Sequence, residues 1–274
     1  MKERNPQAEQ MADESMLRNL AAQAEAIWPQ EQGLFERYEL PAAARIADIG
    51  CGSGEITSRL AARYPEAGIV GVDILEGSVS YARRRYASLA PRVRFEQGDA
   101  FELHLPASQF DLVVCRHMTQ AVPEPQKVLA ELRRICRPGG WVHVLSEDYG
   151  MIHLPRHPTR DLDRFWLELP LAYLAAIGCD GRIGRHTPAL LAAEGFEAIR
   201  LDYVVVDTLR VPRATFAGIL RAWGDGFSAA LAEATGRPHA QVQAQFEAMA
   251  AALEHPAHYG AWHVPIVSAR KPVA

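Results

Sequence analysis

The stretch Ala47–Gly54, with the sequence ADIGCGSG, decides the fold. It predicts a buried strand that ends in a glycine-rich turn and opens directly into a helix. Gly50 and Gly52 can adopt positive φ and carry no Cβ, so a ligand can lie against bare backbone amides at the helix N-terminus. The spacing is GxGxG, one residue shorter at the third glycine than the dinucleotide-binding pattern GxGxxG. Alone, the motif also fits an ordinary strand-to-helix turn.

Acidic residues follow the next two predicted strands. Asp73 ends the run VGVD about twenty residues after the glycine turn, where a carboxylate can accept hydrogen bonds from both hydroxyls of a ribose. Asp99, in QGDA, would accept from an adenine amino group. The alternatives are a helix N-cap at Asp73 and a Gly-Asp turn without a ligand at Asp99. Carboxyl ends of parallel strands share one edge of a sheet, so both acids are expected at one crevice.

Short β-rich runs alternate with amphipathic stretches through the middle of the chain, a pattern typical of a doubly wound α/β sheet that is mostly parallel. Seven strands are expected, at 45–49, 69–73, 92–97, 110–115, 141–147, 199–206 and 261–270. Helices are expected at 54–64, 77–89, 124–136 and 187–194, with a turn at 137–140 that stops the third helix.

The same pattern predicts four segments of the chain. An N-terminal helical cap spans 1–40, a ligand-binding core 41–150, a lid insertion 151–185, and the rest of the sheet 186–274, with a helical insertion at 210–256. Long structureless loops are rare in compact domains, so both insertions are expected to be largely helical. Their aromatic residues are expected either in the core or as walls of a chamber above the sheet. Deleting residues 1–40 is expected to weaken cofactor binding.

Composition excludes several classes of protein. The chain has 274 residues, 49% of them hydrophobic, and a formal net charge of −4, which offers no surplus of positive charge for a phosphate backbone. No segment suggests a membrane span or a signal peptide, so we expect a cytoplasmic protein. The four cysteines lack any CxxC pair and are expected as buried reduced thiols. No tight cluster of metal ligands is visible, and no metal is expected.

The ordered motifs ADIGCGSG, VGVD, GDA, FDLVV and LRRICRPGGW resemble those of the class I S-adenosylmethionine-dependent methyltransferase family, over about residues 45–147. The stretch after the fourth strand is similar to the ubiquinone and menaquinone biosynthesis group, many members of which have a histidine where this chain has Ala121. The resemblance implies a Rossmann-like methyltransferase fold and S-adenosylmethionine as cofactor. The cofactor-binding residues expected on the motifs and beside them are Trp28, Asp48, Gly50, Cys51, Gly52, Gly54, Asp73, Ile74, Asp99, Ala100, Arg116 and His117.

The activity implied is methyl transfer to an O, N or C atom of a small molecule, in secondary metabolism. In-line positioning can supply much of the acceleration, and a base is needed only if the acceptor must lose a proton. The candidates for that base are His117, Asp148 and His153, with Glu147 and Tyr149 also close to the expected sheet edge. Tyr149, Tyr173 and Arg185 are expected to contact the substrate. For His117 a capping or packing role, and for Arg185 a solvated charge near a helix start, are the alternatives.

Three other functions share parts of this pattern. An RNA or protein methyltransferase would use the same cofactor site, but the net charge argues against RNA, and the chain lacks the Asn/Asp-Pro-Pro-Tyr tetrapeptide of amino-methylating nucleic-acid enzymes. A catalytically silent cofactor-binding protein would be expected to have lost glycines or the ribose acid. A nicotinamide oxidoreductase fits the glycine spacing poorly. The expected partner is therefore a small-molecule acceptor, with no nucleic acid and no membrane, and a homodimer stays open.

Overall fold

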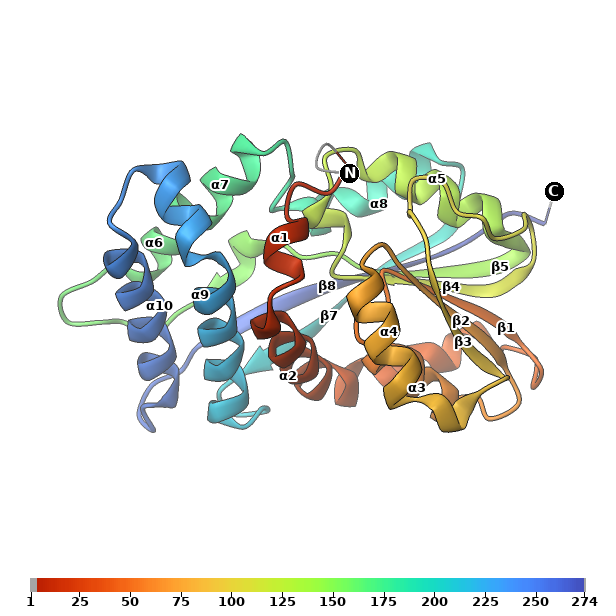
Figure 1. Ribbon diagram of the computed structural model, residues 1–274, viewed down its shortest axis with the longest axis horizontal. Coiled ribbons are helices and arrows are strands. Elements are labelled where there is room, and N and C mark those ends of the chain that lie inside the picture. Colours follow the sequence, from red (N-terminus) through yellow and green to blue (C-terminus); the bar gives the residue numbers. More distant parts are fainter. Residues whose placement is uncertain (1–3, 274) are drawn as a thin grey trace.

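A mixed eight-stranded sheet forms the centre of the computed structural model, which describes residues 4–273 (Figure 1). The strand order is β3-β2-β1-β4-β5-β8-β6, and β7 pairs with β8. Strands β1 to β5 are parallel, whereas β8 is antiparallel to β5, β6 and β7. The bounds are β1 Arg45–Ile49, β2 Gly68–Asp73, β3 Val93–Gln97, β4 Phe110–Arg116, β5 Cys136–Leu145, β6 Ile152–His153, β7 Glu197–Asp207 and β8 Ala261–Arg270. The predicted doubly wound fold is confirmed, with β6 as an additional short strand.

Helices cover both faces of the sheet. Figure 1 shows α3 (Glu55–Arg63) and α4 (Glu76–Arg85) on one face, and α5 (Pro125–Ile135) and α8 (Ile183–Ala193) on the other. In α5 the buried side chains Val128, Leu129, Leu132 and Ile135 recur at helical spacing, so one face of the helix packs on the sheet. Strand β4, which is buried at every residue, lies between the two layers. Three short 3-10 helices, η2 (Ala87–Leu89), η3 (Thr119–Ala121) and η4 (Tyr149–Met151), complete the connections.

The N-terminal segment folds as α1 (Ala8–Met11), α2 (Glu14–Glu31) and the 3-10 helix η1 (Gln32–Tyr38). Asp13 caps α2 by accepting a hydrogen bond from the Ser15 amide at 2.8 Å. Helix α2 buries Met16 and Ile27 in the core, whereas α1 buries no residue. Deleting residues 1–40 would therefore remove part of the core, and a truncation that removes only α1 is the cleaner test of cofactor binding.

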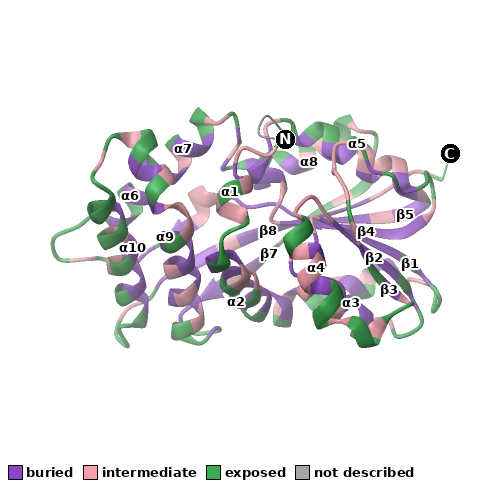
Figure 2. Cartoon of the chain, in the orientation of Figure 1, coloured by how far each residue is buried: buried purple, intermediate pink, exposed green. Residues whose placement is uncertain are grey.

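A helical lobe stands at one end of the sheet. It consists of α6 (Leu162–Glu168), α7 (Pro170–Ala176), α9 (Arg213–Thr235) and α10 (His239–Glu254), and Figure 1 shows α1 and α2 between this lobe and α4. Figure 2 shows that the lobe's inward surfaces are buried. Trp223 of α9 meets Trp262 of β8 edge to face, with ring centroids 5.4 Å apart, so the end of the sheet packs into the lobe.

The turn expected at 137–140 is wrong, because this segment belongs to β5, which begins at Cys136. Gly139 takes φ 73° and donates its amide to the Lys271 carbonyl at 2.9 Å, and Lys271 donates back to the Gly140 carbonyl at 2.9 Å. These backbone hydrogen bonds extend the strand through a shift of register opposite Phe110. The same strand ends at Leu145, before Glu147. No helix among residues 4–273 is long and apolar enough to cross a membrane.

Candidate active site

The glycine turn after β1 is held against the end of β2. The amides of Gly50 and Cys51 both donate to the Val72 carbonyl, at 2.8 and 3.0 Å. Gly52 takes φ 52°, and a Cβ there would lie 2.9 Å from Leu20 Cδ1 of α2. Glycine is therefore required at this position both by the backbone conformation and by the close approach of the N-terminal helix. Gly54 begins α3 at φ 81° and does not line the pocket described below.

Asp73 ties the glycine turn to the start of the next helix. Its Oδ2 accepts from the Gly52 amide at 2.8 Å, and its Oδ1 accepts from the Leu75 amide at 2.9 Å. Burial raises the pKa of the Asp73 carboxyl, and the hydrogen bonds from Leu75 and Gly52 oppose that shift. The N-cap of α4 is Leu75, so the alternative of an N-cap at Asp73 is wrong. Each carboxylate oxygen of Asp73 has a second lone pair, which leaves it able to accept from a ligand.

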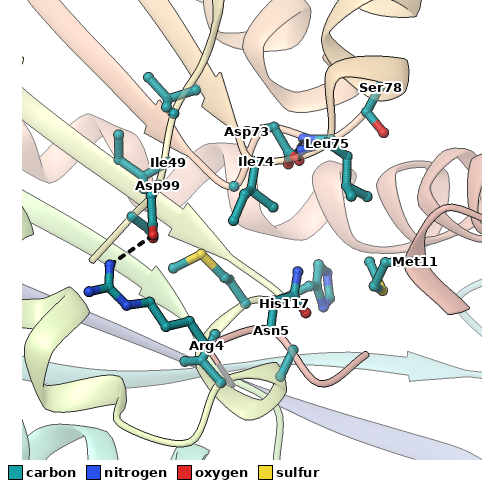
Figure 3. Close-up of a pocket in the computed structure, with 18 of the residues that line it drawn as sticks. Arg4, Asn5, Met11, Ile49, Asp73, Ile74, Leu75, Ser78, Asp99 and His117 are labelled. Carbon is teal, nitrogen blue, oxygen red and sulfur yellow. Dashed lines mark hydrogen bonds and ion pairs between the residues drawn. The ribbon is translucent and has the colours of Figure 1, made fainter. Parts of the chain in front are cut away.

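Asp99 lies at the end of the same pocket and contacts the N-terminal segment. Its Oδ1 accepts from the Phe101 amide at 2.9 Å, and its Oδ2 pairs with Arg4 Nη1 at 3.0 Å. Figure 3 shows this ion pair on one side of the pocket and Met11 on the other. Arg4 and Met11 thus bring the N-terminal segment over the carboxyl edge of the sheet.

The pocket at this edge has a volume of about 860 Å³, including its open mouth. Residues from β1, β2, β4 and the N-terminal segment surround it, so the strand ends predicted to converge do so. Of the residues expected to bind the cofactor, those that line this pocket are Gly50, Gly52, Asp73, Ile74, Asp99, Ala100, Arg116 and His117. No sequence motif indicates the other lining residues, which include Arg4, Asn5, Met11, Leu20, Ser78 and Met118.

A smaller cavity of about 360 Å³ adjoins this pocket through shared residues, among them Gly50 and Arg116, and is lined also by Asp48 and Cys51. Asp48 is buried and accepts from the Thr57 hydroxyl at 2.6 Å. Burial raises the pKa of the Asp48 carboxyl to about 6. The cavity therefore places a carboxylate beside the Arg116 guanidinium, under helix α2.

Arg116 belongs to a buried polar network that none of the sequence motifs predicts. Arg116 Nε donates to Glu31 Oε1 at 2.8 Å, His143 Nε2 lies 2.9 Å from the same oxygen, and the Tyr38 hydroxyl lies 2.6 Å from His143 Nδ1. Burial opposes ionisation of Glu31, but Arg116 and His143 prevail and lower its pKa to about 2. A histidine inside the apolar strand WVHVL was the available signal. The network fixes α2 to the sheet, and it leaves Arg116 Nη2 buried without a hydrogen-bond partner.

His117 and Glu147 form a dyad beside the pocket. His117 Nδ1 lies 2.6 Å from Glu147 Oε1, and both side chains are nearly inaccessible to solvent. His117 takes φ 53°, in the left-handed region. Its Nε2 is buried and has no hydrogen-bond partner. When Glu147 is ionised and His117 neutral, the carboxylate accepts from Nδ1–H and Nε2 keeps its lone pair, which is the arrangement of a general base.

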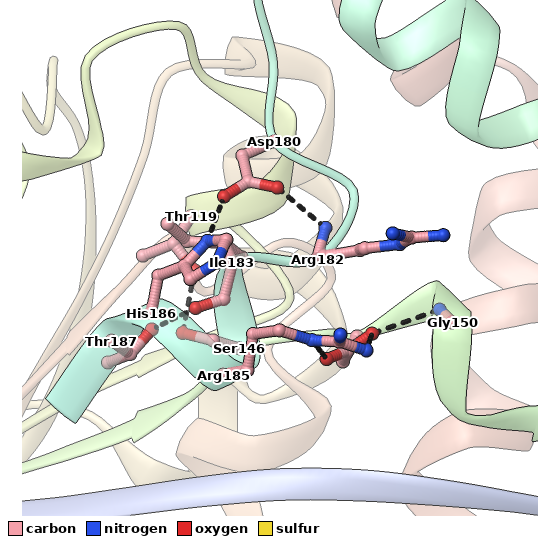
Figure 4. A network of polar contacts seen from close by, with 10 residues as sticks. Thr119, Ser146, Gly150, Asp180, Arg182, Ile183, Arg185, His186 and Thr187 are labelled. Carbon is pink, nitrogen blue, oxygen red and sulfur yellow. Dashed lines mark hydrogen bonds and ion pairs between the residues drawn. The ribbon is translucent and has the colours of Figure 1, made fainter.

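The structure does not bring the other two expected bases to the pocket. Both oxygens of Asp148 are taken up by Arg185, at 2.5 Å from Nε and 3.0 Å from Nη2, and Oδ1 also accepts from the Gly150 amide (Figure 4). Arg185 is thereby committed to Asp148 and lines neither pocket. His153 is exposed on β6 beside His263, because its side chain points away from the core-facing Ile152.

Tyr149 and Tyr173, expected at the substrate, line a second pocket of about 400 Å³ within the helical lobe. Burial, and then the neighbouring Glu147, raise the pKa of Tyr149 well above its usual value.

Trp28, expected at the cofactor, lies elsewhere. It is buried against Phe35, with ring centroids 5.5 Å apart, and lines none of these three pockets. Among residues 4–273 no group of side chains has the arrangement of a metal site.

Comparison with known proteins relates this site to a family. The family model described as "Methyltransferase domain" matches residues 46–140. The chain is 41% identical over 115 residues to a trans-aconitate 2-methyltransferase of Methylobacterium nodulans, an alignment that covers 42% of this chain and 43% of the relative. It is 33% identical over 102 residues to a demethylmenaquinone methyltransferase of Deinococcus radiodurans, covering 37% and 42% of the two chains. The chain thus spans less than half the length of these curated relatives.

Among solved structures, the chain is similar to the YcgJ protein of Bacillus subtilis, with a TM-score of 0.60 at 19% identity. That similarity covers 89% of this chain and 99% of the other, so it extends the shared fold beyond the matched domain and into the flanking elements.

Proposed function

We propose that the chain transfers a methyl group from S-adenosylmethionine to a small-molecule acceptor, because residues 46–140 match the family model described as "Methyltransferase domain". The observation that carries the proposal is the meeting of Gly52 and Asp73 in one pocket, joined by a hydrogen bond of 2.8 Å. We assign Gly52 to the family's glycine turn and Asp73 to its ribose acid, and both residues line the same pocket.

The residues around the pocket fit this cofactor. Asp73 offers the acceptors for a ribose diol, and Asp99 those for an adenine amino group. Arg116 Nη2, a buried donor without a partner, fits the carboxylate of the methionine part, and the Asp48 carboxylate fits its ammonium. When bound, the cofactor supplies an electrophilic methyl group on a sulfonium.

The dyad of His117 and Glu147 is proposed as the general base. An acceptor hydroxyl, amine or acidic carbon would give its proton to His117 Nε2, and the Glu147 carboxylate would stabilise the imidazolium through Nδ1–H. The short contact between the two residues, 2.6 Å, keeps Nδ1 engaged and Nε2 directed away from Glu147. Asp148 and His153 have no such position and are not proposed as bases.

A small acceptor is proposed because the helical lobe holds a second pocket, one layer of side chains from the dyad. That pocket measures about 400 Å³ including its open side and suits a small organic molecule. A polymer substrate would need an open, accessible groove at the sheet edge, where α1 and α2 lie in this chain. An RNA substrate would also need a basic surface, which a net charge of −4 does not supply overall.

The test is transfer of a labelled methyl group from S-adenosylmethionine by the whole chain. Extracts of small metabolites, total RNA and a protein lysate would be incubated separately with the wild type and with His117→Asn. We expect label in the metabolite fraction only, and much less of it with the variant. Label confined to RNA or protein would overturn the proposed acceptor class, and no label in any fraction would support a protein that binds the cofactor without catalysis.

A further inference from the structure

Six of the ten residues that line the second pocket are aromatic. Tyr149 meets Trp166 and Trp223 edge to face, at centroid distances of 5.5 and 5.7 Å, and Phe246 meets Trp166 at 6.3 Å. Phe227, half-buried on α9, contributes a further ring. Such rings present flat apolar surfaces and positive edges, which suit another planar ring better than a flexible chain. We call this set, with Tyr173, the aromatic chamber.

No charged residue lines the aromatic chamber among the residues that the structure describes. Its remaining lining is Gln7, Pro170, Leu174 and Leu231. A carboxylate or phosphate placed here would lose its hydration without gaining a cation, at a cost that binding rarely recovers. The chamber therefore selects against anionic ligands such as tricarboxylates.

Two polar groups in the wall lack a hydrogen-bond partner, Nε2 of Gln7 and Nε1 of Trp166. Trp166 is 3% exposed, and its Nε1–H, which can only donate, has no hydrogen bond. A buried donor of this kind is satisfied by an oxygen acceptor, such as the carbonyl, ether or hydroxyl oxygen of a ligand. The wall thus provides a place for an oxygen on an otherwise apolar ring.

The aromatic chamber lies one layer of side chains from the dyad. Trp223 of the chamber packs on Trp262 with centroids 5.4 Å apart, and Trp262 in turn faces His117 at 6.3 Å. Tyr149, a wall of the chamber, is close enough to Glu147 for that carboxylate to raise its pKa. The N-terminal segment links the two pockets as well, since Gln7 lines the chamber while Asn5 lines the cofactor pocket.

From these observations we propose that the aromatic chamber binds the ring end of the methyl acceptor, and that this end is an uncharged planar ring system that carries an oxygen substituent. The reacting atom of the acceptor would extend past Trp262 to the dyad and the cofactor pocket. This inference rests on the proposed function, because it assigns the chamber to that reaction. It separates this chain from relatives whose names specify a tricarboxylate, since the chamber has no cation to bind one.

Calorimetry with chemically defined probes tests the proposal on the full chain saturated with S-adenosylhomocysteine. The probes are 2-naphthol, its saturated counterpart decahydro-2-naphthol, and trans-aconitate. We expect 2-naphthol to bind at least tenfold more tightly than decahydro-2-naphthol, and trans-aconitate not to bind. Binding of trans-aconitate in preference to 2-naphthol, or equal binding of the two ring probes, would overturn the proposal.

Variants locate the binding. Phe227→Glu places a charge on the half-buried wall and is expected to abolish 2-naphthol binding, whereas Tyr203→Glu, on a β7 residue that is 46% exposed, is a matched control expected to change nothing. Retained 2-naphthol binding in Phe227→Glu would overturn the assignment of the chamber. S-adenosylhomocysteine binding is measured in a separate titration before the probes are added. Its absence in the wild type would count against the proposed function, whereas its presence without 2-naphthol binding would count against the chamber alone.

Discussion

His117 Nδ1 and Glu147 Oε1 lie 2.6 Å apart at the carboxyl edge of the sheet, with His117 Nε2 buried and unpartnered. The two residues come from the ends of neighbouring parallel strands, β4 and β5. The backbone at His117 takes φ 53°, which turns the residue out of the strand direction. Non-glycine residues in this region are uncommon and gather at functional sites.

Replacing either member of the dyad is expected to slow methyl transfer with little change in cofactor affinity. We expect His117→Asn to lower kcat by about 10²–10⁴-fold, the usual range for a lost general base. Glu147→Gln should lower kcat less, and should change the shape of the kcat–pH profile, because the amide does not stabilise an imidazolium. Steady-state kinetics with the acceptor found by labelling would measure both. An unchanged profile in Glu147→Gln would rule out the positioning role.

The buried network around Glu31 is expected to contribute strongly to stability. Glu31→Gln removes the buried carboxylate that accepts a hydrogen bond from Arg116, so we expect a loss of about 3–5 kcal/mol in the free energy of unfolding. Because the folded pKa of Glu31 is lowered to about 2, its contribution is present above pH 4.5 and lost as the pH falls toward 2.

Urea titrations would measure this loss. The matched control is Glu36→Gln, a residue whose side chain is 77% exposed and lies 3.5 Å from Arg63. Its expected effect is under about 1 kcal/mol, as for other surface ion pairs. Equal effects of the two substitutions would contradict a buried network.

Asp48 is expected to make the protein less stable as the pH rises from about 4 to about 6. Burial raises the pKa of Asp48 in the folded chain to about 6, above the ordinary value of 3.8. Between these two pH values the carboxyl ionises more readily in the unfolded chain, which stabilises the unfolded state relative to the folded one. Asp48→Asn should remove this slope and raise the free energy of unfolding above pH 6 by up to roughly 3 kcal/mol, since a tenfold change in proton affinity is about 1.4 kcal/mol.

Urea unfolding of Asp48→Asn from pH 4 to pH 8 would check this, with Asp225→Asn, a half-exposed aspartate, as control. The same substitution should weaken S-adenosylmethionine binding if Asp48 holds its ammonium. A variant that is no more stable than the wild type at pH 8 would argue against a strained carboxylate at this position.

Removing residues 1–11 is expected to weaken S-adenosylhomocysteine binding while leaving the fold intact. Arg4, Asn5 and Met11 line the cofactor pocket, but α1 buries no residue, and the cap of α2 at Asp13 is retained. We expect about a tenfold loss of affinity, with a urea midpoint close to that of the wild type. Full affinity in the truncated chain would show that this segment does not cover the site.

The sequence predicted the sheet and eight of the residues that line the pocket at its carboxyl edge, because both depend on local signals. A glycine-rich turn, an acid at a strand end and an apolar run can each be recognised without knowing which residues pack on them. Asp73 and Asp99 lie at the edge of the sheet that the strand order predicts. The positions of Trp28 and His153 were predicted wrongly. Trp28 lies in the N-terminal segment and His153 in the lid insertion, and the direction of a side chain in either segment depends on contacts far away in sequence. Arg185 was expected to contact the substrate but pairs with Asp148, a contact that the sequence does not indicate.

The network of Glu31, Arg116 and His143 shows the other limit. Each residue lies in a different element, and only tertiary packing brings the three within hydrogen-bond distance. A polar residue in an apolar run indicates that something pairs with it, but does not name the partner.

Cofactor binding at Asp73 tests the central claim most directly. S-adenosylmethionine and S-adenosylhomocysteine would be titrated by calorimetry into the wild type, Asp73→Ala, Asp73→Asn and the surface control Asp225→Ala, with circular dichroism to verify folding. The account predicts micromolar binding by the wild type and the control, and a loss of at least tenfold in both Asp73 variants. A folded wild type that binds neither compound, or Asp73 variants that bind both as tightly as the wild type, would contradict it.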